Sequence, residues 1–115
     1  MNRFLMVATV LALPLFSGLA FADDIEGMWK RPNGILVSIH KCGTEFCVTA
    51  ASGAHKGESA GKMAASGAGK YAGTITDLEA GKTYSGKSAL VGDSLTISGC
   101  VLGGLICKGE NWARQ

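Results

Sequence analysis

The sequence predicts an all-β domain, a sandwich or barrel of short antiparallel strands. Three observations predict this fold class. Apolar and polar residues alternate with a period of two through much of the chain, as half-buried antiparallel strands do. Turn signals separate the alternating stretches, namely "RPNG", "EAGK", "VGDS" and "LGGL". Beyond the N-terminal apolar run, no segment shows the spacing of an amphipathic helix.

Residues 1–22 have the pattern of a cleaved signal peptide. A basic residue precedes the apolar run "FLMVATVLALPLF", and Ala20 and Ala22 provide an A-x-A motif for cleavage after Ala22. The run is shorter than the roughly 20 residues of a spanning helix, and Pro14 interrupts it. The alternative is an uncleaved membrane anchor. We expect a periplasmic or secreted bacterial protein, with no stable membrane anchor and no lipoprotein cysteine at the cut, whose single domain spans 23–115.

The charge pattern excludes one class of partner. The 115 residues carry a formal net charge of +2, and removal of Arg3 with the signal peptide lowers it by one. Lysines are scattered singly, most often beside glycine, and form no basic stripe. We therefore expect no binding to nucleic acid.

Four stretches carry the clearest alternation and are predicted strands: 34–42, 70–77, 82–91 and 93–100. In each stretch one face collects the apolar or small residues and the other collects hydroxyl or charged residues. The predicted inward positions are Ile35, Val37, Ile39, Tyr71, Gly73, Ile75, Tyr84, Gly86, Leu90, Leu95 and Ile97. His40 falls on an outward face.

The segment 51–70 differs from the rest of the domain. It consists almost entirely of Ala, Gly, Ser and Lys, and Met63 is its one residue able to fill a core. We expect a long mobile loop here, with weak strand pairing at its ends.

The four cysteines lie in the domain that follows the signal peptide, and export to an oxidising compartment favours disulfides. A two-residue turn at Gly103-Gly104 places Cys100 opposite Cys107, and Cys42 faces Cys47 across "GTEF". Opposed residues have Cα atoms about 4.5–5.5 Å apart, within disulfide range. We therefore predict Cys42–Cys47 and Cys100–Cys107, although four cysteines also allow two crossed pairings.

Two other readings of the cysteines stay open at this point. A zinc site would use the four cysteines, with His40 nearby, but an oxidising compartment disfavours it. Free or reactive thiols are the other alternative, yet spacings of four and six residues are unlike the C-x-x-C redox motif. We expect no metal and no cofactor.

The motif "GKTYSGKS" at 81–88 satisfies the phosphate-loop pattern by letter. A phosphate loop needs a preceding buried strand and a following helix, whereas this segment alternates as a strand with Lys87 facing outward. His40 and His55 are the two histidines, and no nucleophile or carboxylate pair accompanies them in the sequence. We therefore expect no nucleotide binding and no enzymatic activity.

Several segments resemble a family of small exported bacterial proteins, the domain-of-unknown-function family 2147. The resemblance runs from Ile25 to the C-terminus and is carried by "GKTY", "LTISGCVLGGLIC" and a closing W-x-R. It implies a small lipocalin-like barrel of seven or eight short strands. In lipocalin-like barrels the Trp of an early G-x-W packs against an Arg near the last strand. By this analogy Gly27, Trp29 and Arg114 close one end of the barrel.

The resemblance implies no settled activity, so two functions are carried forward. The first is a non-catalytic periplasmic binding module that takes a small apolar ligand into the barrel, because an eight-stranded barrel has room for its own side chains or one small ligand. The candidate lining residues are Trp29, Ile39, Tyr71, Tyr84 and Leu95. The second is a structural or protein-interaction module of the cell envelope.

Overall fold

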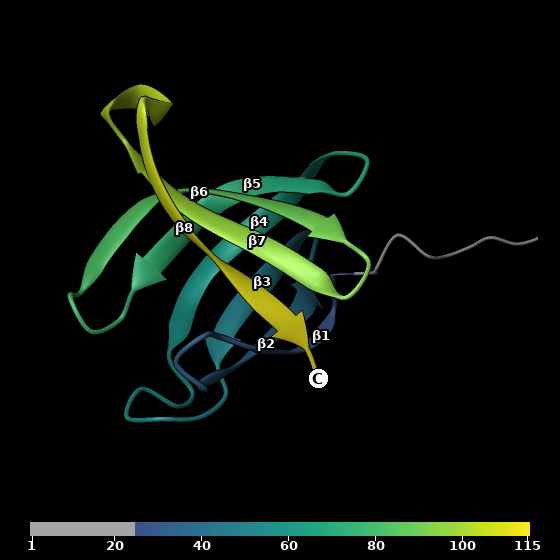
Figure 1. Cartoon of the computed structure of the whole chain (residues 1–115), viewed down its shortest axis with the longest axis vertical. Coiled ribbons are helices and arrows are strands. Elements are labelled where there is room, and N and C mark those ends of the chain that lie inside the picture. Colours follow the sequence, from purple (N-terminus) through teal and green to yellow (C-terminus); the bar gives the residue numbers. More distant parts are fainter. Residues whose placement is uncertain (1–24) are drawn as a thin grey trace, which may run out of the picture.

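The structure is a computed structural model that describes residues 25–115, so the predicted signal peptide lies outside the described part. It is a closed barrel of eight antiparallel strands (Figure 1). The strands are β1 (Gly27–Lys30), β2 (Leu36–Cys42), β3 (Glu45–Ala50), β4 (Ser59–Gly67), β5 (Lys70–Asp77), β6 (Lys82–Val91), β7 (Ser94–Val101) and β8 (Ile106–Arg114). Each strand pairs with the next along the chain, and β8 returns to β1. The all-β prediction is confirmed, in the form of a barrel.

The barrel interior is built by the period-two pattern. Along β2, Val37 and Ile39 are buried and His40 is exposed. Along β7, Leu95 and Ile97 are buried and the residues beside them are not. Every strand except β6 contributes a residue to the buried cluster, and Leu90 of β6 packs against it. The cluster comprises Ile25, Trp29, Val37, Ile39, Phe46, Val48, Ala60, Met63, Tyr71, Leu95, Ile97 and Trp112. No helix within residues 25–115 is long and apolar enough to cross a membrane.

The predicted loop over 51–70 is wrong in its central part, because β4 occupies Ser59–Gly67. The glycines that suggested a loop are needed because this strand packs closely against its neighbour. A Cβ at Gly61 would lie 2.2 Å from the carbonyl oxygen of Thr74 on β5, so no larger residue fits there without a shift of the backbone. Met63 is fully buried and Ala60 is also in the core. Small residues let this strand approach its neighbour closely.

Both disulfides have the predicted partners, Cys42–Cys47 and Cys100–Cys107. The register of the first differs from the prediction, since Cys42 pairs with Glu45 and Cys47 pairs with His40. Gly43, with φ of 71°, allows a two-residue turn here instead of the expected four-residue loop. The two cysteines are diagonal neighbours, and their Cα atoms are 5.8 Å apart, which a disulfide spans.

The β7–β8 hairpin has the predicted register, with Cys100 opposite Cys107 and Val101 opposite Ile106. Gly103 and Gly104 both have positive φ, 67° and 95°, as a primed hairpin turn requires. The strands separate one residue earlier than expected, however, so Leu102 belongs to the tip and not to the ladder.

The two ends of the barrel differ. The base carries the β2–β3, β4–β5 and β6–β7 turns together with the C-terminus, and the mouth carries the other four connections. The seam between β1 and β8 consists of two residue pairs, Trp29 with Arg114 and Lys30 with Ala113. From Trp112 back to Ile106, β8 therefore extends towards the mouth without pairing with β1.

Candidate functional site: a cup at the mouth of the barrel

The mouth opens into a cavity of about 490 Å³. Its lining comes from the mouth-side halves of the strands and from the connections between them. Ligand sites in proteins commonly have volumes of 300–1,000 Å³, so this cup is large enough for a small molecule.

Most of the wall is aliphatic. The apolar lining residues are Ile35, Val37, Ala50, Ala60, Ile75, Leu78, Ile97, Val101, Ile106 and Trp112. Val37, Ala50 and Ile97 are buried and so belong to both the core and the cavity wall. Such a wall favours an apolar ligand, because burying apolar surface contributes about 25 cal/mol per Å².

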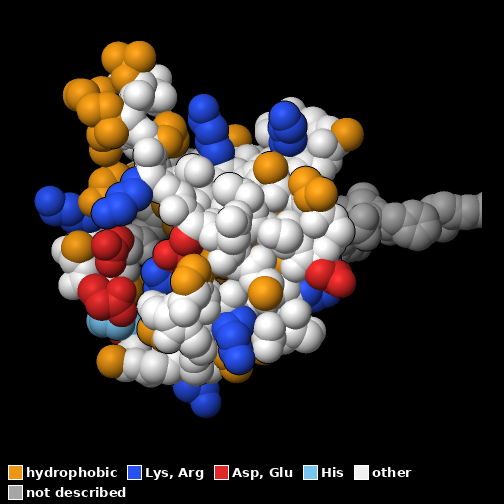
Figure 2. All heavy atoms as spheres, in the orientation of Figure 1, with side chains coloured by type: hydrophobic (Ala, Val, Ile, Leu, Met, Phe, Trp, Pro, Cys, Tyr) orange, Lys and Arg blue, Asp and Glu red, His pale blue; other side chains and the backbone are white. Residues whose placement is uncertain are grey.

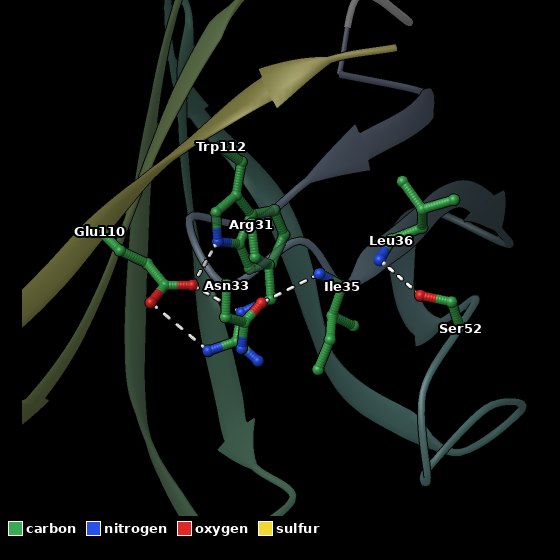
Figure 3. A network of polar contacts seen from close by, with 7 residues as sticks. All are labelled: Arg31, Asn33, Ile35, Leu36, Ser52, Glu110 and Trp112. Carbon is green, nitrogen blue, oxygen red and sulfur yellow. Dashed lines mark hydrogen bonds and ion pairs between the residues drawn. The ribbon is translucent and has the colours of Figure 1, made fainter.

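One polar network crosses the cavity wall at the seam (Figure 3). The Arg31 Nε donates to Glu110 Oε1 at 2.6 Å, and Arg31 Nη2 donates to Glu110 Oε2 at 3.3 Å. The indole Nε1 of Trp112 donates to the same Oε1 at 2.7 Å. Glu110 thus lies between Arg31 on the β1–β2 connection and Trp112 on β8, and it links the two elements just where the strand pairing has ended.

Arg31 and Glu110 each stabilise the charged form of the other. Burial raises the pKa of Glu110, but the hydrogen bonds from Arg31 and Trp112 outweigh burial and hold that pKa below its ordinary value. The hydrogen bond to Glu110 raises the pKa of Arg31 in spite of partial burial. Both groups are therefore charged at neutral pH, as a bidentate ion pair.

Further polar groups surround the opening of the cup. His55, in the β3–β4 connection, lies 3.2 Å from Glu58, and it lines the cavity with Ser52 of the same connection. On the opposite side, Lys108 contributes a cation to the lining. Tyr84, Thr76, Asp77 and Glu79 complete the polar part of the lining. The cup therefore has an apolar interior and a polar, zwitterionic rim.

The predicted lining residues fall into two groups. Tyr84 lines the cavity. Trp29, Ile39, Tyr71 and Leu95 are buried core residues and are not part of the lining, so their assignment as ligand contacts is corrected. Their side chains point into the barrel, as the alternation predicts, but they lie on its base side, where side chains fill the interior. Phe46 packs edge-on against Tyr71 there, with ring centroids 5.6 Å apart.

The predicted closure of one end is present at the base. The Arg114 Cζ lies 4.4 Å from the Trp29 ring centroid, and the ring has no exposed surface. Trp29 Nε1 donates to the carbonyl oxygen of Ile25 at 2.9 Å. Arg114 also donates to the Glu26 carbonyl oxygen, and its Nε pairs with Asp93. Gly27, with φ of 133°, is 3.4 Å from Arg114 Nη1 where a Cβ would stand, so its lack of a side chain leaves room for the guanidinium.

The sequence pattern did not predict the cluster of Arg31, Glu110 and Trp112. A signal was available in "KGENWAR", where Lys108, Glu110 and Trp112 share one face of a strand. A carboxylate that shares the inward face of a strand with a Trp is partly removed from water and needs a hydrogen-bonding or charged partner. Its partner Arg31 is 79 positions away in sequence, however, so no local pattern identifies it.

Two other sequence observations have a structural outcome. "GKTYSGKS" covers a turn and part of β6, and Lys87 is exposed on that strand, so the segment is not a phosphate loop. Among residues 25–115 there is no group of three or more His, Cys, Asp or Glu side chains that could hold a metal ion.

Comparison with known proteins identifies one family. No curated protein and no solved structure matches the chain significantly. Residues 58–114, which include β4 to β8, both cysteines of the second disulfide and the Glu110–Trp112 part of the network, match the family model described as "Uncharacterized protein conserved in bacteria (DUF2147)". This stretch is shorter than the resemblance found by reading the sequence, which begins at Ile25. The resemblance to the bacterial family DUF2147 is therefore confirmed over residues 58–114.

Proposed function

We propose that this barrel is a non-catalytic binding module that holds one small, mainly apolar ligand in the cup. The observation that carries the proposal is the cavity of about 490 Å³ with a largely aliphatic wall, open at one end of an otherwise filled barrel. A barrel of eight strands has room for its own side chains or one small ligand. Here the base side follows the first pattern and the mouth side the second.

The distribution of polar groups supports a ligand with one polar end. Arg31 and Glu110 neutralise each other at the wall, so neither offers a strong unpaired charge to the interior. Lys108 and Tyr84 are at the lining of the same cavity and can bind a carboxylate, a phosphate or a hydroxyl group. An aliphatic chain in the cup with its polar end at the rim satisfies both regions.

The proposed location is the periplasm or the exterior of a bacterial cell. Two disulfides support an oxidising compartment, where small domains commonly use them. The signal-peptide pattern of residues 1–22 supports the same compartment. Detection of the protein in the periplasmic or culture fraction, with its N-terminus at Asp23, tests this part of the proposal.

Titration with cis-parinaric acid, a fluorescent fatty acid, tests ligand binding directly. We expect saturable fluorescence enhancement with one site per chain. Ile75→Trp adds a large ring at a half-buried lining position and should lower the affinity roughly tenfold or more. The matched control is Lys87→Trp, which adds the same ring to an exposed outward position of β6 and should leave the affinity unchanged.

The proposal fails if the folded protein binds neither parinaric acid nor a long-chain alcohol. It also fails if binding is seen but Ile75→Trp and Lys87→Trp behave alike, because the probe would then bind outside the cup. Circular dichroism of each variant shows whether the barrel is intact.

A further inference from the structure

The tip of the β7–β8 hairpin is an unusual surface for a small barrel. Val101, Leu102, Leu105 and Ile106 are 41%, 68%, 85% and 57% exposed. Elsewhere in residues 25–115, the exposed large hydrophobic side chains are Met28 and Val91. Four aliphatic side chains therefore gather on six consecutive residues. Figure 2 shows them as an apolar projection at one corner of the molecule, with cationic side chains next to it.

The hairpin is built to hold these side chains outward. The Cys100–Cys107 disulfide joins the two strands directly below the tip. Leu102 has φ of 54° and is the one non-glycine residue with positive φ among the described residues. A branched side chain in this conformation is energetically unfavourable, and Asn or Gly would suit the backbone better. A strained, exposed leucine on a covalently stapled tip points to a function for its side chain.

We propose that this tip is a membrane-docking element that inserts its aliphatic side chains into the surface of a phospholipid bilayer. The proposal does not rest on a ligand in the cup. Its occupant is a lipid surface, because the tip is convex and purely aliphatic. Protein–protein hot spots use Trp, Tyr and Arg in desolvated pockets, and the tip has none of these. The surface that four side chains can bury is also much smaller than the roughly 800 Å² that each partner buries in a stable protein dimer.

The charges beside the tip fit a phospholipid surface. Lys108 follows Ile106 by two residues on the same face of β8 and is exposed. When the aliphatic tip reaches the acyl region, Lys108, two residues further along β8 from Ile106, lies at the depth of the phosphate groups. A cation attracts an anionic lipid surface with about 1 kcal/mol per Lys or Arg, so anionic lipids should strengthen docking.

The position of the tip relates docking to the cup. Val101 and Ile106 belong to the tip and also to the cavity lining. Docking through the tip therefore brings the mouth, and not the base, towards the lipid. Val91, the other strongly exposed aliphatic residue, is the last residue of β6, next to the β6–β7 turn at the base, and would face away from the membrane.

Vesicle co-sedimentation of the purified, disulfide-intact protein tests the proposal. The vesicles are phosphatidylcholine, with and without a fraction of phosphatidylglycerol. We expect the protein to bind both, and the mixed vesicles more tightly. Leu102→Asn combined with Leu105→Ser should lower the partition coefficient roughly tenfold or more, because two aliphatic side chains are no longer available to insert into the bilayer. Lys108→Gln should remove the preference for phosphatidylglycerol.

Controls separate docking from folding and from the cup. Val91→Ser removes an exposed aliphatic side chain at the base and should leave vesicle binding unchanged. Leu105→Ser alone, at a residue with ordinary φ of −73°, keeps the test valid if the double variant folds poorly. Neither Leu102 nor Leu105 lines the cavity, so the double variant should still bind parinaric acid, and failure of one proposal leaves the other standing.

Three results would overturn docking. The first is wild-type protein that remains in the supernatant with both kinds of vesicle. The second is vesicle binding that the tip variants do not reduce, or that Val91→Ser reduces equally. The third is a dimer in analytical ultracentrifugation that the tip variants dissolve while vesicles bind nothing, which would assign the tip to a second copy of the chain.

Discussion

The base and the mouth of the barrel close the same seam with the same pair of residue types in exchanged positions. At the base, Trp29 comes from β1 and Arg114 from β8, and the guanidinium lies directly over the ring. At the mouth, Arg31 follows β1 and Trp112 comes from β8, and Glu110 stands between them. The one added carboxylate changes a stacked contact into a hydrogen-bonded network.

The difference shows that one end of the barrel stabilises the fold and the other end encloses the cavity. At the base, Trp29 is completely buried, with the Arg114 guanidinium over its ring, and it helps to fill the interior. At the mouth, Trp112 is also buried from solvent, but it is part of a cavity wall. We therefore expect substitutions at the base to change mainly the free energy of unfolding, and substitutions around the mouth to change mainly what the cup accepts.

The largest expected effect is that of Trp29→Ala. Truncation of a buried Trp costs about 3–5 kcal/mol of unfolding free energy, and here it also leaves the Ile25 carbonyl oxygen without its donor. Urea denaturation with the disulfides intact measures the change. Trp112→Ala is the matched comparison and should cost less, because this ring already borders an open cavity. An equal or greater loss at Trp112 would contradict the distinction between base and mouth.

A smaller effect is expected at the partner of Trp29. Arg114→Ala should cost about 1–2 kcal/mol, because it removes a stacked cation and the packed stem of the side chain. In a double-mutant cycle with Trp29→Ala the two losses should be non-additive by about 1 kcal/mol. Asp93→Asn is the control, since its carboxylate is 84% exposed and should contribute little. A coupling of zero would show that the stacked contact adds nothing beyond burial.

The smallest effect concerns Glu110 and depends on pH. Its pKa in the folded protein is lowered below that of the unfolded chain, so its contribution is complete above the unfolded value of about 4.3. The contribution is lost as the pH falls from there through the folded pKa. Glu110→Gln should therefore cost about 1 kcal/mol at neutral pH and progressively less in acid. Urea denaturation of both proteins from neutral to acidic pH measures this, and curves that stay parallel would disprove it.

Much of the strand pattern could be predicted because it is local. Period-two alternation located β2, β5, β6 and β7, and two glycine-containing turns located the disulfide partners. The strand β4 was missed because its small residues are required by close contact with the neighbouring strand. A Cβ at Gly61 would clash with the carbonyl oxygen of Thr74. Composition alone cannot distinguish a glycine that gives freedom to a loop from one that gives room to an adjacent strand.

The site was less predictable than the fold. Inward-facing residues were identified correctly from their alternation, yet the cavity lies beside Tyr84 and not beside Trp29, Ile39, Tyr71 or Leu95. Alternation tells which face of a strand points inward, but all these residues share that property. Which part of the interior is filled depends on the side chains that meet there from all eight strands.

By itself, the amino-acid sequence determined the all-β class, the turns at "RPNG", "EAGK", "VGDS" and "LGGL", and the pairing of the cysteines. Each of these depends on residues within a few positions of one another. The tertiary structure decided three further features: that the base is filled, that the mouth is hollow, and that Arg31 meets Glu110 across 79 positions. Barrel closure is the physical reason. It brings β8 back to β1 over only two residue pairs, and the side chains beyond that short seam either stack and exclude solvent, as at the base, or form a polar wall around open space, as at the mouth.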